Sequence, residues 1–274
     1  MLDLFTVLWG GARNIYVNNF CDVTLPSLMQ PDNLPAAREM IGSYCIYADD
    51  STREAVAPAL NRMEPIIPVE LAPLVAGPWQ VNPCTKQQMA KSGAKGHYLL
   101  VVSADWAFGN GSILNMARLC DGTRNPILFG FPKIPPEAFT EIKGVFESGG
   151  RISNREMVSL WSRFGGGGPC TITPSEVPGE WIVSHRTPTP CLRPDEAIIN
   201  FYSSNNTPNQ GYDHALPMWM VENRYPWHFI TDSDTFFVVE IAVSWTGLSG
   251  PWGLELLSRG DVFFSHCRET WRAR

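Results

Sequence analysis

A continuous apolar run spans Tyr98-Leu99-Leu100-Val101-Val102, and Ser103-Ala104-Asp105 follows it directly. The run does not alternate between polar and apolar residues, which is typical of a parallel strand that is covered on both faces. We therefore predict a central strand of a parallel sheet here. The carboxyl end of this strand would deliver Asp105 to the edge of the sheet.

Strands and helices alternate around this run. Further strands are predicted at short apolar segments bounded by turn or charged residues, namely Leu4–Trp9, Ser43–Ala48, Ile66–Leu71 and Ile127–Phe131. Helices are predicted over Ile15–Met29 with an end or kink at Pro26, over 52–62 from a capping box of Ser51 and Glu54, in a short segment from Thr85, and after Ser112. This order predicts an α/β fold, with a mostly parallel sheet and helices on both faces.

The second half of the chain is less regular. One helix is predicted from Pro136 to Gly149, and another from a capping box of Ser153 and Glu156. Residues 165–195 contain four consecutive glycines and six prolines, which predicts a loop or lid, and later strands or a hairpin are predicted around Phe229 and 236–243. We expect one domain, in which an α/β region over 1–164 is completed by a loop-rich region over 165–274.

Length and composition limit the possible functions. The 274 residues are 44% apolar and 18% charged, as in a globular chain with a large core. A net charge of -6 disfavours a nucleic acid as partner, since its backbone needs a clustered positive field. The sequence has no apolar run long enough for a membrane span and no signal-peptide pattern, so we expect a cytoplasmic protein. Seven cysteines without CxxC spacing are expected to be reduced thiols, mostly in the core.

Ligands of parallel sheets bind beyond the carboxyl ends of the strands. The candidate residues at such ends are Trp9, Gly10, Arg13, Asp49, Asp50 and Asp105. A carboxylate held rigidly after a buried strand is an oxygen ligand of the kind that a hard divalent cation prefers. The alternative role for Asp105 is structural, as a cap on the glycine turn Gly109–Gly111.

Four further residues are candidates for chemistry. Asp232 and Asp234 form an Asp-x-Asp pattern that either lies on a tight turn between strands or supplies a general base or an extra metal ligand. Two carboxylates this close would raise the pKa of one of them unless a cation neutralises them. His214 lies in a predicted loop, as a metal ligand or a surface residue. Trp106 adjoins Asp105 and could stack on a sugar or a base.

Several common catalytic motifs are missing from the sequence. It has no G-x-S-x-G elbow, no Walker loop, no HExxH helix and no G-x-G-x-x-G fingerprint after the first strand. These absences argue against a hydrolase, a kinase, a protease and a dehydrogenase.

Three segments resemble bacterial proteins related to glycosyltransferases of the A-type fold. They are Phe5-Thr6-Val7-Leu8-Trp9-Gly10-Gly11, Asp22-Val23-Thr24-Leu25-Pro26-Ser27-Leu28 and Ala104-Asp105-Trp106-Ala107-Phe108-Gly109-Asn110-Gly111-Ser112. The resemblance implies a Rossmann-like sheet that binds a nucleotide sugar, with a divalent metal, Mn or Mg, held by Asp105 against the donor diphosphate. The sequence departs from the family's usual acidic motif at Ser103, where a second aspartate is expected.

The sequence thus predicts a glycosyltransferase that uses a nucleoside-diphosphate sugar. The donor would contact the strand-end residues and Trp106, and the acceptor would lie under the second half of the chain. Two alternatives stay open: a nucleotidyltransferase on a similar sheet, and a non-catalytic carbohydrate-binding or assembly protein of the same fold, which Ser103 favours. The acceptor could be a glycan, a protein, a small molecule or a modified base, although the acidic charge disfavours nucleic acid.

Overall fold

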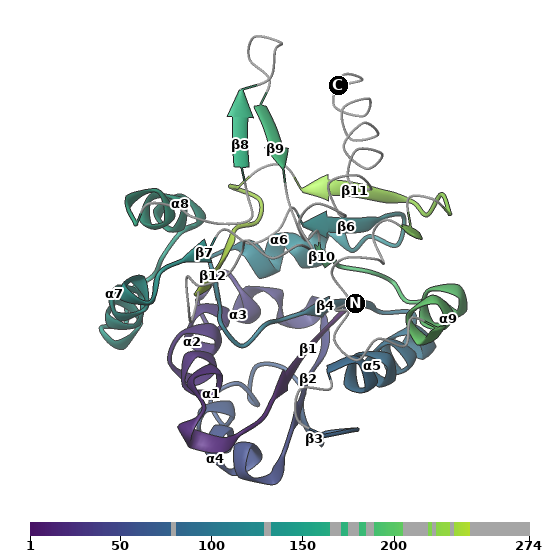
Figure 1. The fold of residues 1–274 in the computed structure, drawn as a ribbon, viewed down its shortest axis with the longest axis horizontal. Helices are drawn as coiled ribbons and strands as arrows, with labels where there is room; N and C mark the ends of the chain where they lie inside the picture. Colours follow the sequence, from purple (N-terminus) through teal and green to yellow (C-terminus); the bar gives the residue numbers. More distant parts are fainter. Residues whose placement is uncertain are drawn as a thin grey trace, which may run out of the picture.

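The computed structural model describes residues 1–77, 81–128, 133–164, 171–174, 181–184, 189–204, 219–220, 223–230 and 233–241. Its main sheet has four strands in the order β3 (Val69–Pro73), β2 (Ile41–Ala48), β1 (Leu2–Leu8) and β4 (Tyr98–Val101). Every neighbouring pair in this sheet is parallel (Figure 1). The order 3-2-1-4 is the one found in doubly wound Rossmann-type sheets. The predicted α/β class with a mostly parallel sheet is confirmed.

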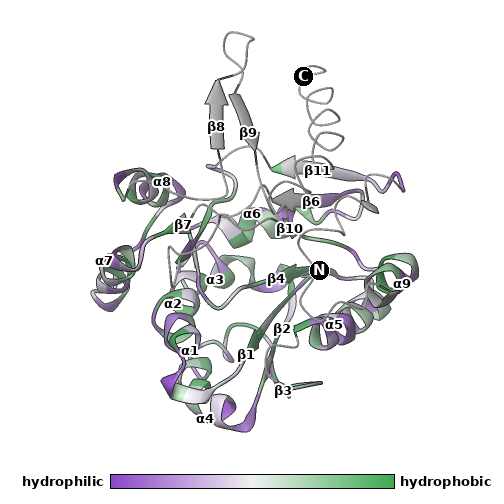
Figure 2. Cartoon of the chain, viewed as in Figure 1, coloured by the Kyte–Doolittle hydropathy of each residue, from purple (hydrophilic) through white to green (hydrophobic). Residues whose placement is uncertain are grey.

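Helices cover both faces of the main sheet. Successive strand residues point to opposite faces, so neighbouring residues of one strand pack in different apolar clusters. Leu4 of β1 and Tyr44 of β2 belong to one apolar cluster, whereas their chain neighbours Phe5 and Cys45 belong to another. Figure 2 shows much of β1 and β2 as hydrophobic, as expected for strands buried on both sides.

The first cluster includes residues of the helical segments between β1 and β3, and of α6 (Ser112–Leu119), which lies later in the chain. The segments between β1 and β3 that contribute are α1 (Ile15–Asn19), the π-helical turn η2 (Phe20–Thr24), α2 (Leu25–Leu28), α3 (Leu34–Ala37), η3 (Arg38–Met40) and α4 (Asp50–Leu60). The short turn η1 (Gly11–Arg13) leads from β1 to α1. The opposite face packs against α5 (Val81–Lys95) and α9 (Glu196–Ser204), through residues such as Met89 and Ile198. Among the described residues, no helix combines the length and apolar character needed to cross a bilayer.

Smaller sheets join distant parts of the chain. One has the order β10 (Thr189–Pro190), β6 (Asn125–Leu128) and β11 (Trp227–Ile230), and another has β5 (Trp106–Phe108), β12 (Val238–Ile241) and β7 (Lys133–Ile134). Two further strands, β8 (Thr171–Pro174) and β9 (Trp181–Ser184), pair with each other. Helices α7 (Pro136–Glu147) and α8 (Asn154–Arg163) pack beside β12 (Figure 1).

Several sequence predictions about strands were wrong. The run at 98–101 was predicted as a central strand but forms β4, which stands last in the main sheet, and the interior strands are β1 and β2. A single antiparallel bridge joins Leu99 to Leu192 on the outer side of β4. The strand is apolar although it stands at the end of the sheet, because Tyr98 and Leu100 pack in one apolar cluster and Leu99 packs in the other.

The strand predicted at 127–131 corresponds to β6, with 129–131 outside the described residues, and it pairs in a separate sheet. Of the later strands or hairpin predicted around Phe229 and 236–243, the strands form as β11 and β12, but β11 pairs with β6 and β12 pairs with β5 and β7, so the two do not make a hairpin. The segment 165–195, predicted as loop, contains β8, β9 and β10.

Three helix starts also differ from the sequence predictions. Helix α4 begins one residue after Asp49, which caps it in place of Ser51. Thr85 lies inside α5, where its hydroxyl donates to the Val81 carbonyl, and so does not begin a helix. Pro26 does not end the first helical segment but stands in the first turn of α2, after the π-helical turn η2. Proline fits there because it has no N–H to donate.

Candidate functional site

The main sheet opens between β1 and β4 at their carboxyl ends. Pairing of β1 with β4 ends at Phe5–Val101, whereas its pairing with β2 continues to Leu8–Ala48. The Thr6 hydroxyl, 2.7 Å from the Val102 carbonyl oxygen, donates to it where the two strands part. The chain builds β1, β2 and β3 in one direction and then places β4 on the other side of β1. This reversal of strand order is where doubly wound sheets form a ligand crevice.

The turn after β1 is held by the start of α4. The N–H of Gly10 donates to Asp49 Oδ2 at 2.7 Å, and the N–H of Gly11 donates to the Thr52 hydroxyl at 2.8 Å. Both glycines have positive φ, 88° and 64°, a conformation that disfavours residues with a Cβ atom. The two strand ends predicted to bind the donor, at Gly10 and Asp49, are therefore brought together.

The Asp49 carboxylate accepts hydrogen bonds from both the turn after β1 and the start of α4. Its Oδ1 atom accepts from the Ser51 hydroxyl at 2.7 Å and from the Thr52 N–H at 2.8 Å. Burial alone would raise the pKa of Asp49, but the hydrogen bonds from Gly10, Ser51 and Thr52 outweigh it and lower the pKa to about 2. A carboxylate this acidic is a poor general base at neutral pH, so Asp49 holds the turn and does not accept a proton from a substrate.

Thr52 and Asn14 were missed by the sequence reasoning. Asn14 caps α1 by accepting from the Tyr16 N–H, and its amide donates to the Trp9 carbonyl at 2.8 Å. The position of Asp49, directly before the helical pattern, was a usable signal for the α4 cap. The hydrogen bond from Gly11 to Thr52 could not be predicted in the same way, because this contact depends on β1 and β2 lying side by side.

The other strand-end candidates differ in exposure. Arg13 and Asp50 are exposed, Trp9 is partly buried, and Asp50 pairs with Arg53. Arg13, in the last turn of η1, offers a cation beside the turn after β1. Since the amides of Gly10 and Gly11 already donate to Asp49 and Thr52, a bound diphosphate would draw on such side-chain cations and on other donors.

Asp105 follows β4 at the other side of the opening. Its side chain is only 7% exposed, and its Oδ1 atom accepts from the Ser103 hydroxyl at 2.6 Å. Its backbone carbonyl accepts from the N–H of Ile241, which fixes it against β12. The glycine turn that Asp105 was alternatively expected to cap is held by Asn33, whose Oδ1 accepts from the N–H groups of Gly111 and Ile113.

Trp106 does not present an open ring face. It is 4% exposed, belongs to the first apolar cluster, and meets Phe108 edge to face with ring centroids 6.0 Å apart. The sequence could not reveal this, because the pairing of β5 with β12 covers a segment that looks like a loop. Stacking of Trp106 on a ligand would require the residues around it to move.

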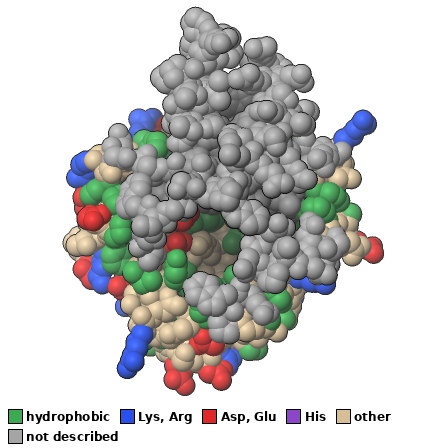
Figure 3. All heavy atoms as spheres, viewed as in Figure 1, with side chains coloured by type: hydrophobic (Ala, Val, Ile, Leu, Met, Phe, Trp, Pro, Cys, Tyr) green, Lys and Arg blue, Asp and Glu red, His purple; other side chains and the backbone are tan. Residues whose placement is uncertain are grey.

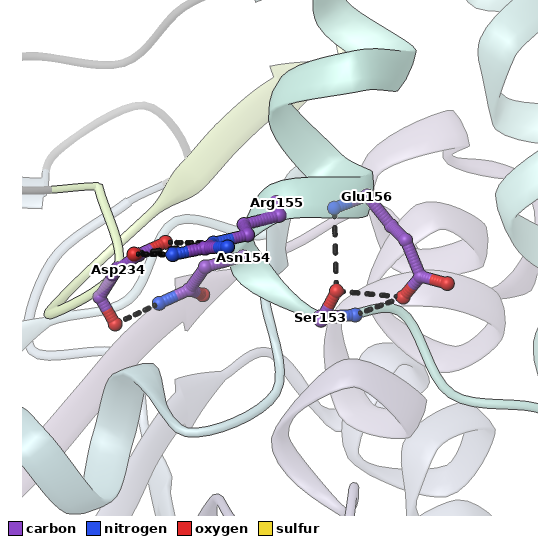
Figure 4. Close-up of polar contacts among 5 residues, drawn as sticks. All are labelled: Ser153, Asn154, Arg155, Glu156 and Asp234. Atoms are coloured by element: carbon purple, nitrogen blue, oxygen red, sulfur yellow. Dashed lines mark hydrogen bonds and ion pairs between the residues drawn. The ribbon is translucent and has the colours of Figure 1, made fainter.

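Asp234 lies in the turn before β12 and pairs with the start of α8 (Figure 4). Arg155 grips its carboxylate with two nitrogens, Nε to Oδ1 at 2.9 Å and Nη2 to Oδ2 at 2.6 Å, and the Asn154 amide donates to its carbonyl. The hydrogen bond from Arg155 lowers the pKa of Asp234. Arg155 and Asp234 are 82% and 46% exposed at their side chains, so the pair is a solvated one.

Asp105 and Asp234 are not brought together. Asp105 stands before Trp106, which pairs with Glu240, whereas Asp234 precedes Val238, which pairs with Phe108. The two aspartates thus lie beyond opposite ends of β5, whose three residues alone span roughly 10 Å at a rise of about 3.3 Å per residue. The carboxylates of Asp105 and Asp234 would not share one metal ion in this arrangement.

Asp232 and His214 lie outside the described residues. Within the part of the chain that the structure describes, no group of three or more histidine, cysteine, aspartate or glutamate side chains is placed to hold a metal ion. Asp105 supplies one carboxylate, and a divalent ion there would need further ligands from the donor or from outside the described residues. Figure 3 shows a hollow near the centre of one face, and described acidic and apolar side chains lie at its left side.

Strand order and the paired strand ends place this chain in the class of doubly wound α/β proteins with a crevice at the reversal of strand order. No protein-family profile matches the sequence, and no curated protein does. Among the solved structures similar to it are two with low TM-scores. The crystal structure of S. aureus TarS 1-349 has a TM-score of 0.33 and 11% identity, over 49% of this chain and 36% of that chain, so this chain spans little more than a third of TarS 1-349.

The second similar structure is the apo form of mouse xyloside xylosyltransferase 1. It has a TM-score of 0.32 and 14% identity, over 85% of this chain and 80% of that chain. TM-scores this low carry no argument about fold or activity. The fold class rests on the strand pairing itself.

Proposed function

We propose that this chain is a glycosyltransferase that takes a sugar from a nucleoside-diphosphate sugar bound between the carboxyl ends of β1 and β4. One observation carries the proposal: the strands separate after Phe5 and Val101 at the reversal of strand order, with the Gly10–Asp49 contact on one side and Asp105 on the other. The resemblance of residues 5–11, 22–28 and 104–112 to A-type glycosyltransferases supports the same reading.

In the proposed reaction, an acceptor hydroxyl attacks the anomeric carbon of the sugar while the bond to the diphosphate oxygen breaks. The exposed Arg13 would balance charge on the departing diphosphate. The acceptor proton needs a base with a pKa nearer neutrality than that of Asp49. Asp234 does not meet this requirement, because its hydrogen bond from Arg155 lowers its pKa, so Asp232 of the Asp-x-Asp pattern stays the candidate base. A divalent ion that assisted the reaction would take Asp105 as one ligand and would need further ligands from the donor or from outside the described residues.

Thermal stability with added nucleotides tests the donor site. We expect uridine or guanosine diphosphate to raise the melting temperature, because a ligand at a hundred times its Kd stabilises the native state by about 2.7 kcal/mol. A larger shift with Mn²⁺ or Mg²⁺ would support metal assistance. Arg13→Ala should weaken the shift.

Arg38→Ala is the matched control. Arg38 is also an exposed arginine in a 3-10 helix. It lies before the amino end of β2, whereas Arg13 lies after the carboxyl end of β1, so the two arginines are at opposite ends of the strands. The shift should survive this change. No shift with any nucleotide at millimolar concentration would refute the donor site.

A specific observation favours the non-catalytic alternative. Ser103 occupies the position of the second aspartate and donates its hydroxyl to Asp105, so this carboxylate already has a protein partner. A carbohydrate-binding or assembly protein would bind the nucleotide sugar, or only the sugar, without turnover. Release of nucleoside diphosphate from a panel of nucleotide sugars separates the two functions.

A further inference from the structure

Two cysteine side chains meet at a junction between distant parts of the chain. Cys120, at the carboxyl end of α6, has its sulfur 3.5 Å from the sulfur of Cys191. Cys191 is fully buried, and Cys120 is partly exposed. The described cysteines are all free thiols, and these two lie in direct contact.

The backbone fixes both thiols from independent directions. The N–H of Cys120 donates to the Met116 and Ala117 carbonyls as the last turn of α6 ends. The N–H of Cys191 donates to the Pro126 carbonyl, and its neighbour Leu192 forms the bridge to Leu99 of β4. The backbone of each cysteine is therefore held in place, and disulfide formation requires the two sulfurs to move from 3.5 Å to a bond length of about 2.0 Å.

We propose that Cys120 and Cys191 are a redox modification site, which a hydroperoxide converts to an intramolecular disulfide. The reaction begins at Cys120, the partly exposed thiol. Burial, and then the neighbouring Cys120 thiol, raise the pKa of Cys191 well above its ordinary value, so Cys191 remains a protonated thiol until its partner is oxidised.

The chemistry proceeds in two balanced steps. The Cys120 sulfur attacks one oxygen of hydrogen peroxide and the O–O bond breaks. Cys120 becomes a sulfenic acid, and the departing hydroxide takes the thiol proton to form one water. The Cys191 sulfur then attacks the Cys120 sulfur, the S–O bond breaks, and the hydroxide departs with the Cys191 proton as a second water. Two thiols lose two electrons in total, and one peroxide gains them.

The disulfide would join α6 to the segment that closes the outer side of β4. Cys120 and Cys191 are 71 residues apart in sequence, so the bond closes a long loop in the unfolded chain. Long closed loops give the larger stabilisation, and we expect oxidation to raise the melting temperature by about 5 °C or more. This site is independent of the proposed sugar transfer.

The test treats the full chain with hydrogen peroxide, blocks remaining thiols and maps the peptides without reduction. We expect one linked pair of peptides containing Cys120 and Cys191, a mass loss of two hydrogens, and reversal by dithiothreitol. Cys120→Ser should abolish the linked peptides and the rise in melting temperature. Cys21→Ser, which removes another partly exposed thiol, should leave both unchanged.

Cys191→Ala provides a readout that does not depend on the disulfide. In this variant, oxidation of Cys120 should stop at the sulfenic acid, which dimedone traps. In the oxidised native chain, Cys120 should react little with dimedone, because it is already in the disulfide. Linkage between other cysteines, or the same mass loss in Cys120→Ser, would overturn the proposal. Overoxidation of Cys120 without any linked peptide in the native chain would do so as well.

Discussion

Asp49 is a residue whose role changes between sequence and structure. It is a carboxylate at a strand end, which suggests a ligand, yet its oxygens accept from Gly10, Ser51 and Thr52. These bonds tie the turn after β1 to the first turn of α4. Asp49 therefore contributes to the proposed site by fixing its backbone.

Asp49→Asn should destabilise the protein by about 1 kcal/mol at pH 7. The asparagine oxygen can still cap α4, but its NH2 group would face the Gly10 N–H, so two donors would oppose each other. The folded-state pKa of Asp49 is lowered from 3.8 to about 2, so its stabilisation is present above pH 4 and is lost as pH falls toward 2. Urea denaturation between pH 7 and 2 measures this. An unchanged pH dependence in the variant would contradict it.

Asp105→Asn tests the other side of the opening. If the charge of Asp105 acts on the donor, sugar-nucleotide turnover should fall about a hundredfold, or about 2.7 kcal/mol in barrier, while the melting temperature stays close to that of the native chain. The fold should survive because an amide oxygen can accept from Ser103 as the carboxylate does. Ser103→Ala, which keeps the carboxylate, is the matched control. Turnover that survives in Asp105→Asn would assign Asp105 a structural role only.

At the scale of elements, the turn from β1 into η1 depends on backbone that only glycine adopts readily. Gly11→Ala should cost about 1–2 kcal/mol, because alanine is strained at its φ of 64°. The added Cβ would also lie 3.0 Å from the Ser51 hydroxyl oxygen. Gly144→Ala in α7 is the control, since nothing lies within 4 Å of a Cβ there and alanine favours a helix by about 0.5–1 kcal/mol. Denaturant midpoints should therefore move in opposite directions, and equal shifts would contradict the assignment.

At the scale of the whole molecule, the late strand β12 completes a core that begins in the first half. It lies between β5 and β7, and Val238 joins the first apolar cluster while Val239 joins the cluster under α7 and α8. The Asn115 and Asn154 amides donate to carbonyls of the turn before it, at Thr235 and Asp234. The region over 1–164 thus packs against β12 and the turn before it, which lie later in the chain.

We expect a fragment of residues 1–164 to lack a cooperative thermal transition near that of the full chain. Loss of β12 would leave β5 and β7 without their shared neighbour and would expose buried residues such as Ala107 and Ile134 to water. Circular dichroism melting of the fragment beside the full chain measures this. A fragment with a similar cooperative transition would show that 1–164 is a domain by itself.

Sequence alone determined the parts of this protein that depend on local pattern. Apolar runs predicted β1, β2 and β4, the alternation of strands and helices predicted the parallel sheet, and the Ser153–Glu156 box predicted the start of α8. The Gly10–Gly11 pair marked the end of β1 for the same reason, since positive φ is a local requirement. The tertiary structure decided what depends on partners distant in sequence. It placed β4 last in the main sheet, buried Trp106 beneath the pairing of β5 with β12, and bound Asp234 to Arg155 on the other side of β5 from Asp105. A side chain's surroundings come from segments a hundred residues away, and no local pattern records which segment will lie beside it.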